Sequence, residues 1–162
     1  MFFNAKNAFS ESLLMEDASN ELKNHIELVI KNPKNFGFKD EAEARSASIG
    51  FIYPYFSVNE WEAILKKGNA VKNKEIKYPP RRIIEVLGGD KPKSVIIQAR
   101  LKNGAWAPSV LGFKNVADSL VLLKNNVRRE NIVLLVNSET HKLYFVDQEK
   151  PHVYSILGKN NE

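Results

Sequence analysis

Apolar residues in the first third of the chain recur at the spacing of an amphipathic helix. Those three or four positions apart, which share one helical face, are Ala18, Leu22, Ile26, Val29 and Ile30. Ser10 or Ser19 is expected to cap this helix, and Asn32-Pro33 ends it, because the residue before a proline avoids the helical region. A second helix is predicted from Asp40, a good N-cap residue, to Gly50, which suits the position just after a helix.

A third predicted helix is marked at both ends by its own residues. Ser57 and Glu60 match a capping box, in which each side chain accepts a hydrogen bond from the other residue's backbone N–H. Phe56 and Trp61 stand at the two positions of a hydrophobic staple, and Gly68 ends the helix. The aromatic link before this helix, 51–56, is expected to be buried. It contains Pro54, which argues against a central strand because proline cannot donate to a ladder.

The second half of the chain is rich in short apolar runs typical of strands. The runs predicted as strands are 83–87, 94–101, 105–113, 131–136, 142–146 and 153–157. Asn103-Gly104 predicts a type I′ hairpin turn, and Pro108 places the strand after it at an edge or a bulge. A helix with Asn115 as N-cap interrupts the strands near 115–126. We therefore expect an α+β fold, with helices on one face of a mostly antiparallel sheet of about five strands.

The length and composition are those of one soluble domain. A chain of 162 residues suits a single domain, expected to cover 1–157 with a frayed tail at 158–162. The absence of cysteine excludes disulfides and thiol chemistry. No signal-peptide pattern and no apolar run of about 18 residues is present, so a cytoplasmic protein is expected. The 18 lysines against 6 arginines, with 17 asparagines, are typical of an AT-rich bacterial genome, which weakens arguments from lysine counts.

The positive charge is concentrated in one segment, 66–82, which we call the basic segment. It carries a net charge of +6 in seventeen residues, whereas the whole chain carries +5. Its cations are Lys66, Lys67, Lys72, Lys74, Lys77, Arg81 and Arg82. A local positive segment on a neutral body indicates an anionic partner, and Tyr78 or Trp61 could stack on a base. A solvated loop is the alternative. A second cluster of Lys124, Arg128 and Arg129 would strengthen the first interpretation if it shared the same face.

No motif in the chain identifies a reaction. His25 lies on the apolar face of the first helix, where a packing role is expected, and His141 and His152 flank the final hairpin too far apart to share a metal. No metal-binding spacing and no G-x-S-x-G motif is present, so no cofactor or metal is expected. Asp90 followed by Gln98-Ala99-Arg100 is only a degraded match to the acidic motif of metal-dependent nucleases.

Two hypotheses remain from the sequence. The first is a module that binds RNA or another polyanion and is toxin-like in layout. Helices before an antiparallel sheet are also the arrangement of small basic ribonuclease toxins, although no residue motif of that group is present. Metal-independent cleavage would use His141, Tyr144, Arg81 and Arg100, with Arg82 and Lys93 as further cations, since it needs proton donors and acceptors near phosphate-binding cations. The alternative is a protein-interaction module, such as an immunity, adaptor or effector protein. It would use the aromatic segment 51–61 or the edge near Pro108.

Overall fold

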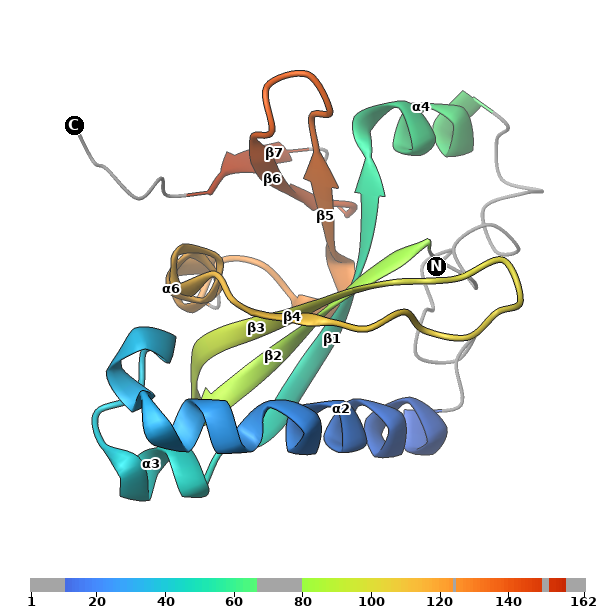
Figure 1. The fold of residues 1–162 in the computed structure, drawn as a ribbon. Helices are drawn as coiled ribbons and strands as arrows, with labels where there is room; N and C mark the ends of the chain where they lie inside the picture. Colours follow the sequence, from blue (N-terminus) through green and yellow to red (C-terminus); the bar gives the residue numbers. More distant parts are fainter. Residues whose placement is uncertain (1–10, 67–79, 124, 150–151, 157–162) are drawn as a thin grey trace.

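The computed structural model describes residues 11–66, 80–123, 125–149 and 152–156 (Figure 1). Its helices are α2 (Glu11–Lys31), α3 (Glu41–Arg45), α4 (Val58–Lys66) and α6 (Lys114–Leu123), with the 3₁₀ turns η1 (Pro33–Phe36) and η2 (Arg129–Asn131). Its strands are β1 (Ser48–Ser57), β2 (Arg81–Gly88), β3 (Lys91–Ala99), β4 (Val110–Gly112), β5 (Ile132–Val136), β6 (Leu143–Asp147) and β7 (His152–Ser155).

The strands form one mixed sheet in the order β4-β3-β2-β1-β5-β6-β7 (Figure 1). The neighbours β1 and β5 run parallel, and the other neighbouring pairs run antiparallel. The predicted α+β class is confirmed, although the described residues contain seven strands rather than about five. The chain passes from β4, at one edge of the sheet, through α6 to β5. The strand β5 lies beside β1 in the middle of the sheet.

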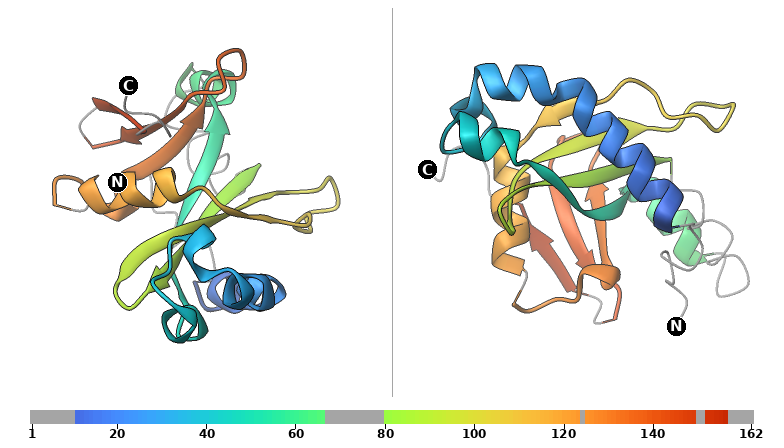
Figure 2. Two further views of the ribbon diagram at one scale, coloured as in Figure 1. Left: turned by 60° about the vertical axis from the view of Figure 1, so that its left-hand side comes forward. Right: turned by 90° about the horizontal axis from the view of Figure 1, so that it is seen from below.

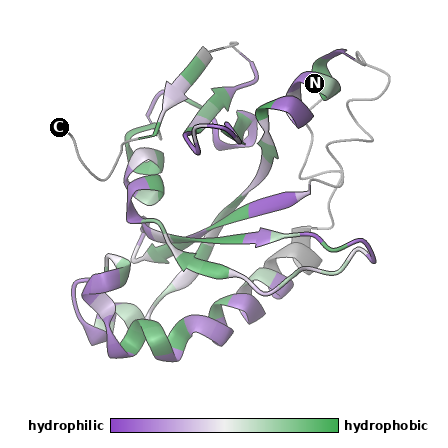
Figure 3. Cartoon of the chain, turned by 45° about the horizontal axis from the view of Figure 1, so that its top comes forward, coloured by the Kyte–Doolittle hydropathy of each residue, from purple (hydrophilic) through white to green (hydrophobic). Residues whose placement is uncertain are grey.

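The sheet is covered on both faces, which corrects the expectation of helices on one face. Successive side chains of a strand point to opposite faces, so β2 sends alternate residues into two cores. The core under α2 contains Ala18, Leu22, Val29, Ile84, Val86 and Ile96. The core under α6 contains Tyr53, Tyr55, Ile83, Val95, Ala117 and Leu120. Figure 2 shows α2 and α6 on opposite sides of the sheet, and Figure 3 shows hydrophobic and hydrophilic stretches alternating along α2.

The predicted start of α4 is confirmed in detail. The Ser57 Oγ accepts a hydrogen bond from the Glu60 N–H at 3.1 Å, and the Glu60 carboxylate accepts one from the Ser57 N–H at 2.7 Å. The rings of Phe56 and Trp61 lie 5.6 Å apart between centroids, as a staple requires. This helix covers a third core, over β5 and β6, formed by Phe56, Trp61, Ile64, Val133, Leu135 and Val146.

Ser57→Ala is expected to lower the free energy of unfolding by about 1 kcal/mol, because it leaves the Glu60 N–H at the helix start without its acceptor. Chemical denaturation measures the change. Ser138→Ala, in the exposed turn between β5 and β6, is the matched control and should change stability by less than about 0.5 kcal/mol. Equal stability of the two variants would mean that the serine cap does not support α4.

The segment 51–56 is part of the central strand β1, so the expectation based on Pro54 was wrong. Pro54 lies opposite Arg82 of β2, but β5 pairs with β1 only from Tyr55 onward. One side of β1 is therefore unpaired at Pro54, and a missing N–H is tolerated there. The segment is buried from Tyr53 to Phe56, so it forms no apolar surface patch.

Several predicted boundaries also differ. The helix α2 already includes Glu11, whereas α3 ends at Arg45 and Gly50 belongs to β1. Asn115 lies inside α6 rather than capping it. In the last hairpin His152 pairs with Asp147, one position from the predicted register. Asp40 does cap α3, because its Oδ1 accepts a hydrogen bond from the Glu43 N–H at 2.9 Å.

Candidate nucleic-acid interface

The basic segment leaves and re-enters the described fold at two known places. Lys66 is exposed at the last position of α4, and Pro80 leads into Arg81 and Arg82 at the start of β2. The segment's other candidate residues, Lys67, Lys72, Lys74, Lys77 and Tyr78, lie outside the described residues, as does Lys124. The structure therefore describes the two places where the basic segment joins the fold, the end of α4 and the start of β2.

Arg81 ties the start of β2 to the start of α4. It lies beside Tyr55 on the α6 face of the sheet, with its guanidinium carbon 5.3 Å from the centre of the tyrosine ring. Its Nη2 donates to the carboxylate of Glu60, the same group that closes the capping box. Burial raises the pKa of Tyr55, and the nearby Arg81 charge opposes that shift. The charge of Arg81 is thus already partly neutralised within the protein.

Arg82 points to the other face and is buried, with 1% of its surface exposed. Its Nη2 donates to Asp17 of α2 at 2.7 Å, and its Nη2 and Nε donate to the Gln98 Oε1 at 2.6 and 3.0 Å. Burial lowers the pKa of Arg82, while Asp17 acts in the opposite direction. Its buried Nη1 has no hydrogen-bond partner among the described residues. This guanidinium is held by three hydrogen bonds, and its Nη1 amino group has no acceptor among the described residues.

Beyond β3 the chain forms a protruding hairpin, residues 100–109, which we call the arm (Figure 1). Arg100 and Trp106 form an isolated bridge, and the Leu101 N–H donates to the Ala105 carbonyl at 2.7 Å. The hairpin predicted from Asn103-Gly104 is therefore confirmed, but its turn type differs. Within the arm only Gly104 has a positive φ, +86°, as in a three-residue loop with a bulge, whereas a type I′ turn would need a positive φ at Asn103 as well.

Two guanidinium groups lie over the indole ring of Trp106. The Arg82 guanidinium carbon is 4.1 Å from the ring centroid, and that of Arg100 is 4.7 Å from it. The Gln98 side chain adds a second link, because its Nε2 donates to the Ala107 carbonyl at 2.8 Å. Arg82 and Gln98 thus connect β2, β3 and the arm into one polar cluster.

A second contact fastens the arm to α2. The Ser109 hydroxyl donates to Glu21, and the His25 Nε2 lies 2.6 Å from the same hydroxyl oxygen. Because the carboxylate can only accept, the single Ser109 proton points to Glu21, and His25 must donate through Nε2. His25 is therefore unable to act as a base on Ser109. We infer that Glu21, His25 and Ser109 position the arm against α2. The sequence did not predict this contact, because Ser109 is 84 positions from His25.

The arm belongs to a second basic segment that could have been recognised in the sequence. Residues 91–117 contain five cations and no acid, and the cations are Lys91, Lys93, Arg100, Lys102 and Lys114. The two basic segments meet in the structure, since the Arg100 N–H donates to the Pro80 carbonyl at 2.7 Å. The end of the segment 66–82 and the base of the arm are therefore hydrogen-bonded neighbours.

The proposed catalytic residues lie on different parts of the sheet. Arg100 follows β3, whereas Tyr144 is on β6, four strand positions away, or about 19 Å at the usual spacing. His141 lies in the turn before β6 with φ +56°. Arg81 faces the α6 side, whereas Tyr144 pairs with Leu135, which belongs to the α4 core. The structure does not bring these four residues together.

Of the second predicted cluster, Arg129 approaches the sheet face on which Arg81 of the basic segment lies. Arg128 is exposed, and the Arg129 Nη1 lies 3.6 Å from the carboxylate of Glu85. Glu85 is on the same strand as Arg81 and faces the same side, but four residues further along, or about 13 Å. Arg129 thus approaches the face of Arg81, whereas Arg82 and the arm lie on the other face.

The described residues offer no metal site. No three histidine, cysteine or acidic side chains within them are grouped so that they could hold an ion. Asp90 lies in the turn before β3 and Gln98 near its other end, about 26 Å apart along the strand, so the degraded nuclease motif is not assembled. Among the described helices, none has the length and apolar character needed to cross a membrane.

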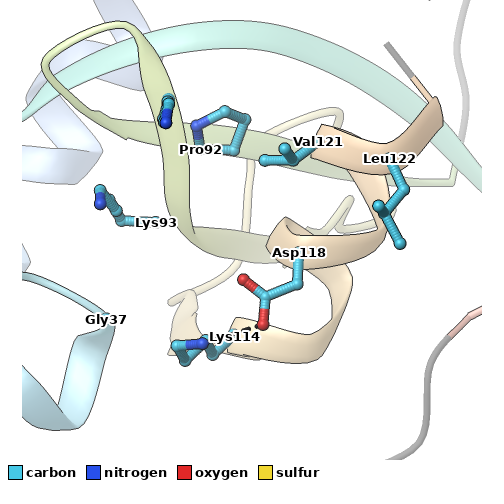
Figure 4. A pocket seen from close by; sticks show the side chains of 8 residues that line it. Gly37, Pro92, Lys93, Lys114, Asp118, Val121 and Leu122 are labelled. Carbon is cyan, nitrogen blue, oxygen red and sulfur yellow. Dashed lines mark hydrogen bonds and ion pairs between the residues drawn. The ribbon is translucent and has the colours of Figure 1, made fainter. Parts of the chain in front are cut away.

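A pocket of about 350 Å³ lies at the start of β3, away from the arm (Figure 4). It is lined by Gly37, Lys91, Pro92, Lys93, Lys114, Asp118, Val121 and Leu122. Two of its lysines already face acids: Lys93 lies 3.6 Å from Glu43, and Lys114 lies 2.9 Å from Asp118. The local charges nearly cancel, so the pocket does not indicate an anionic ligand.

No protein-family model matches the chain, and neither a curated protein nor a solved structure matches it significantly. Support for a function must therefore come from the residues and their geometry.

Proposed function

We propose that the protein binds RNA through a basic surface formed by the segment 66–82 and the arm. The observation that carries the proposal is the hydrogen bond between the Arg100 N–H and the Pro80 carbonyl, which joins the two basic segments of the chain. Together these segments contain a single acid, Glu75. Cations without interspersed acids attract a polyanion and release its counterions when they bind phosphates.

The cations in this surface do not all have the same role. Arg81 and Arg82 are paired with Glu60 and Asp17, so they fix the end of the segment 66–82 that enters β2. Contacts to phosphates fall to the lysines of the segment and to Lys102, which is exposed near the tip of the arm. The proposal is binding rather than cleavage, because the four residues suggested for catalysis are spread over β2, the arm, the turn before β6 and β6 itself.

Reversing the charge of Lys72, Lys74 and Lys77 to glutamate is expected to weaken binding of a 20-nucleotide single-stranded RNA by at least about 100-fold at low salt. Loss of three phosphate contacts should also lower the salt dependence, log Kd against log salt, by a slope of about 2. Fluorescence anisotropy at several salt concentrations measures both quantities.

The matched control reverses the same amount of charge elsewhere. Lys31, Lys34 and Lys39 are exposed at and after the end of α2, which lies ten residues, or about 15 Å, beyond the Glu21 that contacts the arm, and their change to glutamate should leave the slope unaltered. Equal weakening by both variants would show an effect of net charge alone. Unchanged binding in the first variant would make the segment a solvated loop and contradict the proposal.

The rival function, a protein-interaction module, has one structural observation in its favour. The edge strand β4 presents Val110, which is 58% exposed, beside the arm. The other surface named for it, the aromatic segment 51–61, is formed by the central strand β1 and the start of α4, and residues 53–56 and Trp61 within it are buried. Absence of RNA binding by the unmodified protein would leave this edge as the surviving candidate.

A further inference from the structure

We propose that the outer edge of β4 binds an extended acidic peptide of a protein partner, which adds to the sheet as a further strand. This site goes beyond the RNA binding proposed above and does not depend on it. The strand β4 ends the sheet order, so among the described strands β3 alone pairs with it (Figure 1). Its other edge therefore carries backbone N–H and C=O groups that can pair with a second extended chain.

One face of β4 has room for the side chains of a ligand. Val110 and Gly112 point to the same face, because side chains alternate along a strand. Val110 is 58% exposed, and a Cβ atom placed on Gly112 would have no described heavy atom within 4 Å apart from its chain neighbours. Leu111 points the other way and packs against the core under α2. A strand beside β4 could thus place its side chains over Val110 and Gly112.

Phe113, directly after β4, extends this apolar surface. It is 40% exposed and belongs to neither of the cores under α2 and α6. Its φ is +57°, a left-handed conformation that a bulky residue rarely adopts. Residues strained in this way are concentrated at ligand-binding sites. The conformation and exposure of Phe113 therefore agree with a ligand at this edge.

The charge along the edge indicates an acidic partner. Lys91 lies at the start of β3, Arg100 and Lys102 lie in the arm beyond its other end, and the segment 91–117 contains no acid. The other two lysines of this segment add little, because each is paired with an acid. Lys91 and Arg100 are nine positions apart, or about 30 Å at the usual strand spacing. An extended peptide of nine residues has this length, so its acidic side chains would reach the cations at both ends.

Neither RNA nor a second copy of the chain suits this edge as well. An RNA strand has no row of alternating N–H and C=O groups with which to extend a sheet, and it gains little from the apolar side chains of Val110 and Phe113. Two copies joined edge to edge would place like charges opposite one another, which is unfavourable. The opposite edge strand, β7, also presents an exposed valine, Val153, but it contains no lysine or arginine.

Three nine-residue peptides separate strand addition from charge attraction. The first alternates valine with glutamate, and the second alternates valine with lysine. The third is the first peptide with N-methyl groups on two adjacent central residues, which removes a donor from each of its edges. We expect the first peptide to bind, and the other two to bind at least about tenfold more weakly, because both the backbone hydrogen bonds and the acidic charge are needed. Isothermal titration calorimetry at low salt measures the affinities.

Three variants locate the site. Val110→Glu and Val153→Glu change the same residue type at 58% and 57% exposure, on opposite edges of the sheet. The first should weaken binding of the valine–glutamate peptide at least about tenfold, and the second should leave it unchanged. Phe113→Gly should also weaken binding. Glycine adopts a positive φ readily, so this variant should keep its fold, which circular dichroism checks.

Hydrogen exchange supplies a readout that a purely structural role would not change. The valine–glutamate peptide should slow exchange of the β4 amides, because those at the outer edge become hydrogen-bonded to the peptide. Exchange of the β7 amides should stay the same, since that edge remains unoccupied.

The outcomes for this site and for RNA binding are distinguishable. Equal affinity for the first and third peptides, or equal weakening by Val110→Glu and Val153→Glu, would overturn strand addition at β4. Absence of binding of the first peptide by the unmodified protein would overturn it as well and leave RNA binding intact. Slowed exchange of the β4 amides with single-stranded RNA but not with the peptide would assign the edge to RNA and overturn the inference.

Discussion

Glu85→Ala is expected to lower the free energy of unfolding by about 2–6 kcal/mol, because two donors lose their acceptor and each such buried loss costs about 1–3 kcal/mol. The Glu85 carboxylate is completely buried on β2. It accepts hydrogen bonds from the Tyr53 hydroxyl and, at 3.1 Å, from the Phe51 N–H, and it lies 3.6 Å from the guanidinium of Arg129. Burial and the Glu85 charge raise the pKa of Tyr53, so the phenol stays protonated and donates.

Without Glu85, the Tyr53 hydroxyl and the Phe51 N–H would be buried without an acceptor. The neighbouring backbone is adapted to this carboxylate, because a Cβ atom at Gly50 would lie 2.5 Å from its Oε2. Urea denaturation should therefore rank Glu85→Ala below Tyr53→Phe, which removes one of the two donors to the carboxylate and costs about 1.5–3 kcal/mol, the usual range for a hydrogen bond to a charged group. Glu62→Ala, on the exposed side of α4, is the control. A loss in Glu85→Ala no larger than in this control would contradict the buried network.

Arg82→Met should cost about 3 kcal/mol of stability, although methionine retains much of the aliphatic length of the side chain. The buried Gln98 Oε1 would lose both of its arginine donors, and Trp106 would lose the closer of its two cations. Loss of the arginine would cost Asp17 less free energy, since half of its side chain is exposed and water can solvate the carboxylate. The cost therefore arises from the buried amide and the indole more than from the ion pair.

An exposed ion pair of the same type provides the control for this prediction. Arg45 pairs with Glu41 at 2.6 Å, but both side chains are about 60% exposed. Arg45→Met should cost less than about 1 kcal/mol, because water screens the pair. Similar losses in Arg82→Met and Arg45→Met, measured by urea denaturation, would show that the Arg82 cluster contributes no more than a surface salt bridge.

The features predicted correctly from the sequence depend on residues close together in the chain. The capping box of Ser57 and Glu60 and the staple of Phe56 and Trp61 involve residues three and five positions apart. The arm hairpin likewise depends on Gly104 and its neighbours, although the turn type was wrong. Such interactions form within one turn of helix or one hairpin, so the local sequence specifies them whatever the rest of the fold does.

The errors arose where a residue's environment depends on a distant strand. Pro54 argues against a central strand only if both neighbouring strands pair at that position, and β5 begins to pair one residue later. The face covered by α6 was also misplaced. Val116, Ala117 and Leu120 pack into the core that contains Tyr53 and Ile83, and this contact fixes the face of the sheet that α6 covers. The spacing of apolar residues within α6 predicts a buried helical face but not which side of the sheet it packs against.

The candidate interface shows the same division. The charge excess of the segment 66–82 is evident in the sequence, but the partners of Arg81 and Arg82 are not. Glu60 and Asp17 are 21 and 65 positions away from them. His25 likewise reaches Ser109 across 84 positions. Trp106 was not singled out because no local pattern distinguishes a half-buried indole on an arm from one in a core.

The sequence by itself determined the α+β class, the caps at Asp40 and Ser57, the position of the arm hairpin and the local concentration of positive charge, because each follows from periodicity, from neighbouring residues or from a sum over a segment. The tertiary structure alone decided which charges are neutralised and which residues share a surface. It paired Arg82 with Asp17 and placed Arg100 between Pro80 and Trp106. These contacts depend on the register between β2 and β3 and on the packing of α2, which arise only when the whole sheet assembles.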